Sequence, residues 1–180
     1  MFDKEYSFKG KHADMVEKLT GSFSIANADG TTQNKHKLFE RNYDVYLLAP
    51  IIGFLYRRTA EADTSSSNNT KVFADIQMKN IDDLKFNYRL IMLLDTNNEP
   101  NAEARIEKAF RGIENKEDEA LYDKYVLGGV EVLHEKIFAK ANTTEDIINK
   151  LYDFLEEFND RYNDEIDMER VLELARKSSL

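Results

Sequence analysis

Hydrophobic side chains recur at helical spacing along most of the chain. In the segment 80–95, Asn80 is a favourable N-cap, acidic residues fill the first turn, and apolar residues follow at intervals of three and four. The apolar residues that share one face are Ile81, Leu84, Tyr88, Ile91 and Leu94. The segment 143–162 repeats this arrangement after a threonine cap, with one stripe of Ile147, Leu151, Leu155, Phe158 and Tyr162. Pro100 and Gly112 mark a start and a stop for a helix between them. The pattern predicts helical segments over 11–19, 43–56, 80–95, 99–112, 117–139, 143–162 and 167–177.

Two stretches depart from this helical pattern. Residues 20–37 are polar and contain the turn signal Asp29-Gly30, which favours a small hairpin. The segment KVFADIQM, residues 71–78, is compatible with a short strand, and TSSSNNT, residues 64–70, has the composition of a flexible loop. We therefore expect an all-α fold, a compact multi-helix bundle forming a single domain over residues 1–180, with one short β ribbon near residues 22–34 or 71–78.

The most apolar stretch is NYDVYLLAPIIGFLYRR, residues 42–58. Its uninterrupted apolar block has twelve residues between Asp44 and Arg57, whereas a spanning helix needs about 20. The block is apolar nearly all round, which predicts a helix buried in the bundle and capped by Asn42. Pro50 lies well inside it and removes a backbone hydrogen bond. The helix is therefore expected either to kink or to end near Ala49 and restart at Pro50.

Small residues predict a close contact between two of these helices. Val45, Ala49 and Gly53 follow one another at four-residue steps, so they share a helix face that a second backbone can approach. Gly128 and Gly129 interrupt the segment 117–139, and a glycine inside a helix costs about 1 kcal/mol relative to alanine. We expect segments 43–56 and 117–139 to cross at these residues. The alternative is a hinge at Gly128-Gly129 between two shorter helices.

Charge is distributed unevenly along the 180 residues, whose net charge is −9. Residues 1–113 hold 16 basic and 16 acidic residues, whereas residues 114–180 hold nine basic and 18 acidic residues. The acidic final third argues against the whole protein being a DNA binder, although it is also typical of a solvated helical face. The N-terminus lacks the apolar region of a signal peptide, so we expect a cytoplasmic protein that does not contact a membrane.

The residues offer little recognisable catalytic chemistry. There is no cysteine, which excludes disulfides and thiolate sites, and the three histidines are widely separated. Phosphate-binding loops, nucleophile elbows and paired zinc histidines are missing from the sequence, and residues 159–167 lack the spacing of a calcium loop. Glu156, Glu157 and Asp160 fall on a polar face. We expect no catalytic residue, metal site or cofactor, with an undetected hydrolase or nuclease as the alternative.

One basic cluster is a candidate binding site. Arg57 and Arg58 end the apolar segment, while Arg41 precedes it together with Lys35 and Lys37. If the segment folds back on itself, these groups form a patch able to bind a phosphate or an acidic partner. The alternative is that the arginines only solvate the ends of a helix and interact with its dipole.

Two stretches resemble the small Dnd-system-associated proteins of bacteria. They are LFERNYDVYLLAPIIGFLYRR and YDKYVLGGVEVLHEKI, and the likeness covers roughly residues 38–158. The residues that carry it are Phe39, Asp44, Val45, Ala49, Gly53, Phe54, Arg57, Arg58, Tyr125, Gly128, Gly129, Glu131 and Leu133. The resemblance implies an accessory protein of a DNA-phosphorothioation and anti-phage defence system, which contacts other defence proteins and reaches DNA indirectly. It implies no catalytic residue.

From these observations we expect a non-enzymatic interaction protein. A small nucleic-acid-binding regulator that uses Arg41, Arg57 and Arg58 is one alternative. A second is a DNA mimic, in which the acidic final third competes with DNA for a basic partner.

Overall fold

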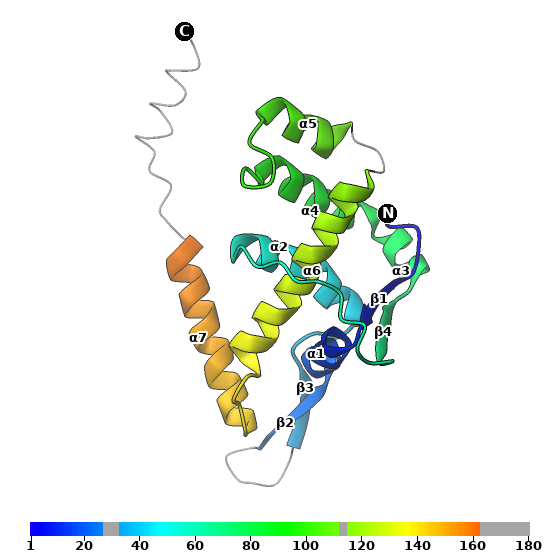
Figure 1. Ribbon diagram of the computed structural model, residues 1–180. Coiled ribbons are helices and arrows are strands. Elements are labelled where there is room, and N and C mark those ends of the chain that lie inside the picture. Colours follow the sequence, from blue (N-terminus) through cyan, green and yellow to red (C-terminus); the bar gives the residue numbers. More distant parts are fainter. Residues whose placement is uncertain (27–32, 112–114, 163–180) are drawn as a thin grey trace.

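The computed structural model describes residues 1–26, 33–111 and 115–162, and within these ranges the chain forms seven helices and four strands (Figure 1). The helices are α1 Lys11–Thr20, α2 Asn42–Leu55, α3 Ala74–Lys79, α4 Ile81–Leu94, α5 Ala102–Phe110, α6 Lys116–Ile137 and α7 Thr144–Tyr162. The strands are β1 Tyr6–Lys9, β2 Ser22–Ala26, β3 Gln33–Lys37 and β4 Asn69–Val72. The helix expected over 167–177 and the stop at Gly112 lie outside the described residues.

Helix α6 is the central element, and α1, α2, α4 and α7 pack against it (Figure 1). Helix α2 crosses it, and this is the most extensive contact between any two elements. Helices α4 and α5 pack on each other towards one end of α6, and α7 runs beside the other end. The mostly helical fold expected from the sequence is confirmed.

The β structure consists of two small antiparallel sheets. Strands β2 and β3 form the hairpin expected between residues 20 and 37, with Ser22 opposite Lys37. Strands β1 and β4 pair with Tyr6 opposite Val72, so the N-terminal residues are tied to the middle of the chain. The segment 71–78 is a strand only as far as Val72, because α3 begins at Ala74. The structure therefore has two ribbons where the sequence predicted one.

Helix α2 is continuous from Asn42 to Leu55, with Pro50 inside it. Of the two alternatives expected at Pro50, the end of the helix near Ala49 with a restart at Pro50 is therefore wrong, and a kink within one helix is the alternative that remains. Asn87 of α4 donates a hydrogen bond from Nδ2 to the carbonyl oxygen of Leu47 (2.8 Å), within the turn that contains the proline. The predicted cap is also displaced by one residue, since Arg41 is the N-cap and its backbone N–H donates to Asp44 Oδ2 (2.9 Å). Asn42 instead donates to the carbonyl oxygen of Lys71 (3.1 Å).

The crossing of α2 and α6 uses the small residues named from the sequence. A methyl group on Gly129 would overlap the carbonyl oxygen of Ala49, and one on Gly53 would overlap the carbonyl oxygen of Tyr125. A methyl group on Gly128 would overlap the carbonyl oxygen of Arg58. The two backbones are thus in direct contact, which only glycine permits. Helix α6 is unbroken from Lys116 to Ile137, so the alternative of a hinge at the glycines is wrong.

Helix α7 packs against α6 with a face shifted slightly from the predicted one. The sequence pattern placed Leu155 in the buried stripe, but Leu155 is exposed and Phe154 is buried. The spacing Ile147, Leu151, Phe154 and Phe158 follows the 3.6-residue period as closely as the predicted spacing does, so the pattern alone did not decide between neighbouring residues. Leu94, assigned to the buried face of α4, is likewise exposed at the end of that helix.

Candidate functional site

The basic residues named from the sequence do not form one patch. Arg41 precedes α2 and Arg57 and Arg58 follow it, so the 14-residue helix separates them by about 20 Å. Arg41 Nη2 lies 2.7 Å from Asp44 Oδ1, and Arg58 Nη2 lies 2.7 Å from Glu135 Oε2. The prediction of a patch by folding back is wrong, because α2 is a single helix. Arg41 and Arg58 pair with carboxylates at its two ends.

Lysines near Arg41 give that end of α2 a weakly basic surface. Lys37 and Lys71 line the same shallow hollow as Arg41, and Lys35 is exposed on β3. Lys71 Nζ is 2.7 Å from Glu5 Oε1, so carboxylates offset two of these cations.

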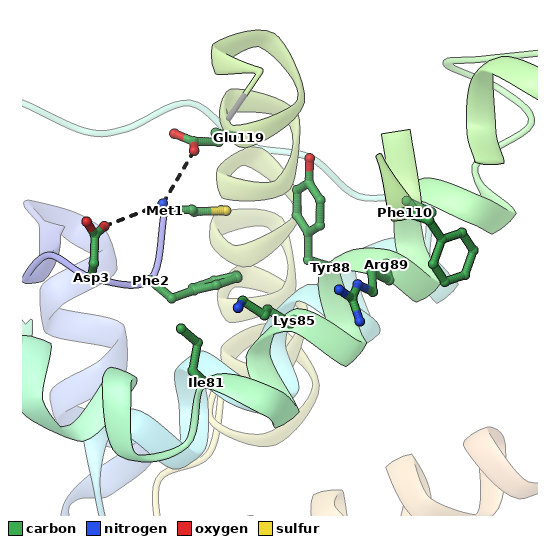
Figure 2. A pocket seen from close by; sticks show the side chains of 10 residues that line it. Met1, Phe2, Asp3, Ile81, Lys85, Tyr88, Arg89, Phe110 and Glu119 are labelled. Atoms are coloured by element: carbon green, nitrogen blue, oxygen red, sulfur yellow. Dashed lines mark ion pairs between the residues drawn. The ribbon is translucent and has the colours of Figure 1, made fainter. Parts of the chain in front are cut away.

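A larger hollow lies between the N-terminal segment, α4, α5 and α6, and it is called the α4–α5 groove below (Figure 2). Its volume is about 430 Å³, within the range of small-ligand pockets. It is half open to solvent, so it resembles a binding groove more than a closed cavity. Its lining residues are Met1, Phe2, Asp3, Ile81, Lys85, Tyr88, Arg89, Ala109, Phe110 and Glu119.

Packed aromatic rings form the base of the α4–α5 groove. The ring of Phe2 meets those of Tyr88 and Tyr122 edge to face, with centroids 6.5 and 5.9 Å away. These contacts hold the N-terminal segment against α4 and α6. Burial, together with the nearby carboxylates of Asp118 and Glu119, raises the pKa of Tyr88 to about 12. The base of the groove is therefore apolar and uncharged at neutral pH.

One wall of the groove carries cations that lack a carboxylate partner. Lys85 and Arg89 stand one turn apart on α4, on the same side as Ile81 (Figure 2). Within the described residues, neither side chain forms an ion pair, and Arg89 lies 5.9 Å from the centre of the Phe110 ring. On the opposite wall, the terminal ammonium of Met1 lies 3.5 Å from Asp3 and 3.6 Å from Glu119. The positive charge of Lys85 and Arg89 is therefore available to a partner.

Large apolar side chains are exposed on α4 and α5, and one of them, Phe110, lines the α4–α5 groove. Phe86 is 65% exposed and Phe110 is 58% exposed, although both belong to helices with a buried face. Leu94 and Ile106 are exposed on the same pair of helices. Clusters of exposed apolar side chains are typical of surfaces that bind other molecules.

A second exposed surface lies on α7 and is called the α7 face below. Tyr152 is 69% exposed and Leu155 is 55% exposed, and both line a shallow hollow with Glu156, Asn159 and Asp160. In the described part of the chain, Glu156 and Asp160 have no cationic partner. The neighbouring Glu157 differs, since its Oε2 lies 2.5 Å from Lys136 Nζ. The α7 face is therefore apolar and acidic.

Two buried polar clusters were not found from the sequence. His12 is fully buried, and its Nε2 lies 3.3 Å from Glu131 Oε1. Burial lowers the pKa of His12, so the neutral ring donates this hydrogen bond. Tyr125 donates from its hydroxyl to Asp95 Oδ2 (2.7 Å), which also accepts from Asn98 Nδ2. Each cluster connects elements that lie far apart in the sequence. We therefore interpret both clusters as stabilising the fold.

Asp123 has the most perturbed carboxyl group near the groove. Burial, followed by repulsion from Glu119 one turn earlier, raises the pKa of Asp123 from 3.8 to about 6. The described residues contain no group of three or more side chains suited to hold a metal ion. None of their helices combines the length and apolar character required to cross a bilayer.

The residues of the groove were missed by the sequence analysis. A usable signal was the pair Lys85 and Arg89, four residues apart beside the apolar Phe86, since cations at this spacing share a helix face. Phe2 and Phe110 gave no such signal, because their positions depend on tertiary packing.

Comparisons with known proteins give no relative for this chain. No protein-family model matches it, and it has no match among curated proteins or solved structures.

Proposed function

We propose that this protein is a non-enzymatic interaction protein that contacts other proteins through the α4–α5 groove and the α7 face. The observation that supports this best is that both surfaces combine exposed apolar side chains with charges that have no ion-pair partner among the residues that the structure describes. Phe110 lies beside Arg89, and Tyr152 lies one turn from Glu156. Aromatic and arginine side chains are enriched at the centres of protein interfaces.

The cellular setting is proposed from the sequence resemblance alone. We propose that the partners are other proteins of a bacterial DNA-modification or anti-phage defence system in the cytoplasm, with DNA reached indirectly through them. The second candidate function is a DNA-mimicking regulator, which the unpaired carboxylates of Glu156 and Asp160 favour. It predicts that DNA competes for the same partner.

The proposal is tested by capturing partners from the native bacterium with a tagged chain, followed by mass spectrometry. We expect the variant Phe110→Ser and the variant Tyr152→Ser with Leu155→Ser each to lose partners that the wild type captures. Phe73→Ser is the matched control, because Phe73 is 55% exposed but lies outside both surfaces. If all three variants capture the same proteins as the wild type, these surfaces are not the interaction sites.

A further inference from the structure

We infer that the α4–α5 groove of one copy of this chain binds the α7 face of a second copy. The inference rests on the proposed function, since it assigns one partner to the two surfaces described above. It goes further in naming that partner, the two faces that meet and the resulting mode of assembly.

The charges of the two surfaces are complementary. The groove offers Lys85 and Arg89, which have no carboxylate partner among the described residues, and the α7 face offers Glu156 and Asp160, which have no cation there. In each pair the residues stand four apart on a helix, so each presents two charges about one turn apart. Two parallel contacts between these pairs would fix the register of one helix against the other.

The apolar parts of the two surfaces also complement each other. Tyr152 and Leu155 project from α7 beside its two carboxylates, and the groove is a hollow of about 430 Å³ with Phe110 at its rim. An amphipathic helix that places apolar anchors in a groove is a common recognition mode. Burial of Tyr152 and Leu155 would remove two of the largest exposed apolar side chains from water.

The contact has to join two copies, because α7 is held in place within its own chain. Phe154 is buried, and its ring lies 6.1 Å from that of Tyr56. Lys136 of α6 pairs with Glu157, and α7 runs beside α6, away from α4 and α5 (Figure 1). One side of α7 is therefore packed against its own chain, and the α7 face on the other side points outward.

A groove-to-helix contact is head-to-tail, since it joins two different surfaces. Such a contact leaves one free groove and one free α7 face on every pair, so further copies add until a ring closes or a chain of copies grows. We therefore expect the average mass to rise with concentration beyond that of a dimer.

The experiment measures mass by light scattering and sedimentation over about 10 µM to 1 mM, the range in which weak contacts are populated. We expect the wild type to associate, and Lys85→Glu with Arg89→Glu, or Glu156→Lys with Asp160→Lys, to weaken association at least tenfold. The exchange of Lys35 and Lys37 for Glu is the control, because it makes the same charge change at exposed positions outside both surfaces. It should leave the association unchanged.

One mixture and one further variant test whether the two charge pairs meet in the contact. An equimolar mixture of the groove variant and the α7 variant reverses both charge pairs at one contact and keeps the native pairing at the other. Because both contacts are then complementary, the mixture should associate as the wild type does, although neither variant associates strongly alone. A chain that carries all four substitutions should associate again, because both members of each charge pair are reversed. Circular dichroism of each variant confirms that it is folded.

A wild-type protein that stays monomeric at 1 mM, or association that the groove variant leaves unchanged, would overturn the inference. These results do not bear on the capture of other proteins, which is a separate measurement. If partners are still captured through Phe110 by a strictly monomeric chain, the inference fails and the proposed function stands. If association follows the charge pairs but no other protein is captured, the inference stands and the proposed contacts with defence proteins fail.

Discussion

The crossing of α2 and α6 and the α4–α5 groove differ in how closely their atoms approach. At the crossing, two backbones are in contact and no space remains even for a methyl group on Gly53 or Gly129. At the groove, about 430 Å³ is open and the ring of Phe110 is largely exposed. The chain thus places three of its seven glycines at one internal contact and leaves large aromatic side chains at the surface.

This difference separates residues that maintain the fold from residues available for binding. A closely packed contact resists any change of volume, because neighbouring atoms have no free space into which to move. A half-open groove tolerates substitution, because water or another side chain replaces the lost contact. Stability and binding should therefore respond to different sets of variants.

The largest expected effect is at the crossing. Gly129→Ala places a methyl group on the carbonyl oxygen of Ala49, a backbone atom that cannot rotate away. We expect a loss of more than about 4 kcal/mol in the free energy of unfolding, measured by urea denaturation, or failure to fold. Ala120→Leu is the control, since Ala120 is an exposed residue of the same helix and should change stability by about 0.5 kcal/mol or less. A stable Gly129→Ala protein would show that the backbones are further apart.

The next effect concerns Asp123, one turn from the groove residue Glu119. Its pKa of about 6 in the folded protein exceeds the ordinary 3.8, so the folded state binds the proton more tightly than the unfolded state. The contribution of Asp123 to stability should then fall as the pH rises from about 4 to 6. At pH 7.5, Asp123→Asn should be more stable by on the order of 2 kcal/mol, and at pH 4 the difference should vanish. Equal stabilities at both pH values would contradict the raised pKa.

A smaller effect is expected where α4 meets α2. Asn87→Ala removes the hydrogen bond to the carbonyl oxygen of Leu47 and should cost about 1 kcal/mol in the free energy of unfolding. Asn87→Asp keeps the size of the side chain but replaces the donor with a carboxylate, so it should cost more. If both substitutions are neutral, the turn around Pro50 does not depend on α4.

The smallest effect on stability is expected at the groove itself. Phe110→Ser should change the free energy of unfolding by about 0.5 kcal/mol or less, because surface substitutions usually do. The same variant should reduce self-association, measured by sedimentation, because Phe110 lies at the rim of the groove. A large loss of stability would mean that Phe110 belongs to the core of the fold and would remove the contrast with Gly129.

The sequence predicted the crossing because its signal is local. A glycine within a helical apolar stripe needs a packing reason, and Gly53 and Gly129 each have one. At Pro50 the sequence left a kink and a break as alternatives, because the local cost of a proline was weighed without the tertiary packing that keeps α2 continuous. The prediction of one basic patch was wrong for the same reason, because one unbroken helix keeps Arg41 away from Arg58.

The α4–α5 groove and the pairing of β1 with β4 could not be predicted from local sequence patterns. The pairing of Tyr6 with Val72 joins segments far apart in the chain, and a four-residue strand carries little periodicity. Phe2 contributes to the groove only because the N-terminal segment packs against Tyr88 and Tyr122. Such residues are found once the tertiary arrangement is known.

The contact between Ala49 and Gly129 has a consequence for the order of folding. It links positions 80 residues apart, so a long loop must close before the two backbones meet, and such closure slows folding. Helices α4 and α5 adjoin in sequence and can form their mutual contact early. Amide hydrogens of α2 and α6 should therefore exchange with solvent only on global unfolding, while those of α5 exchange through smaller openings.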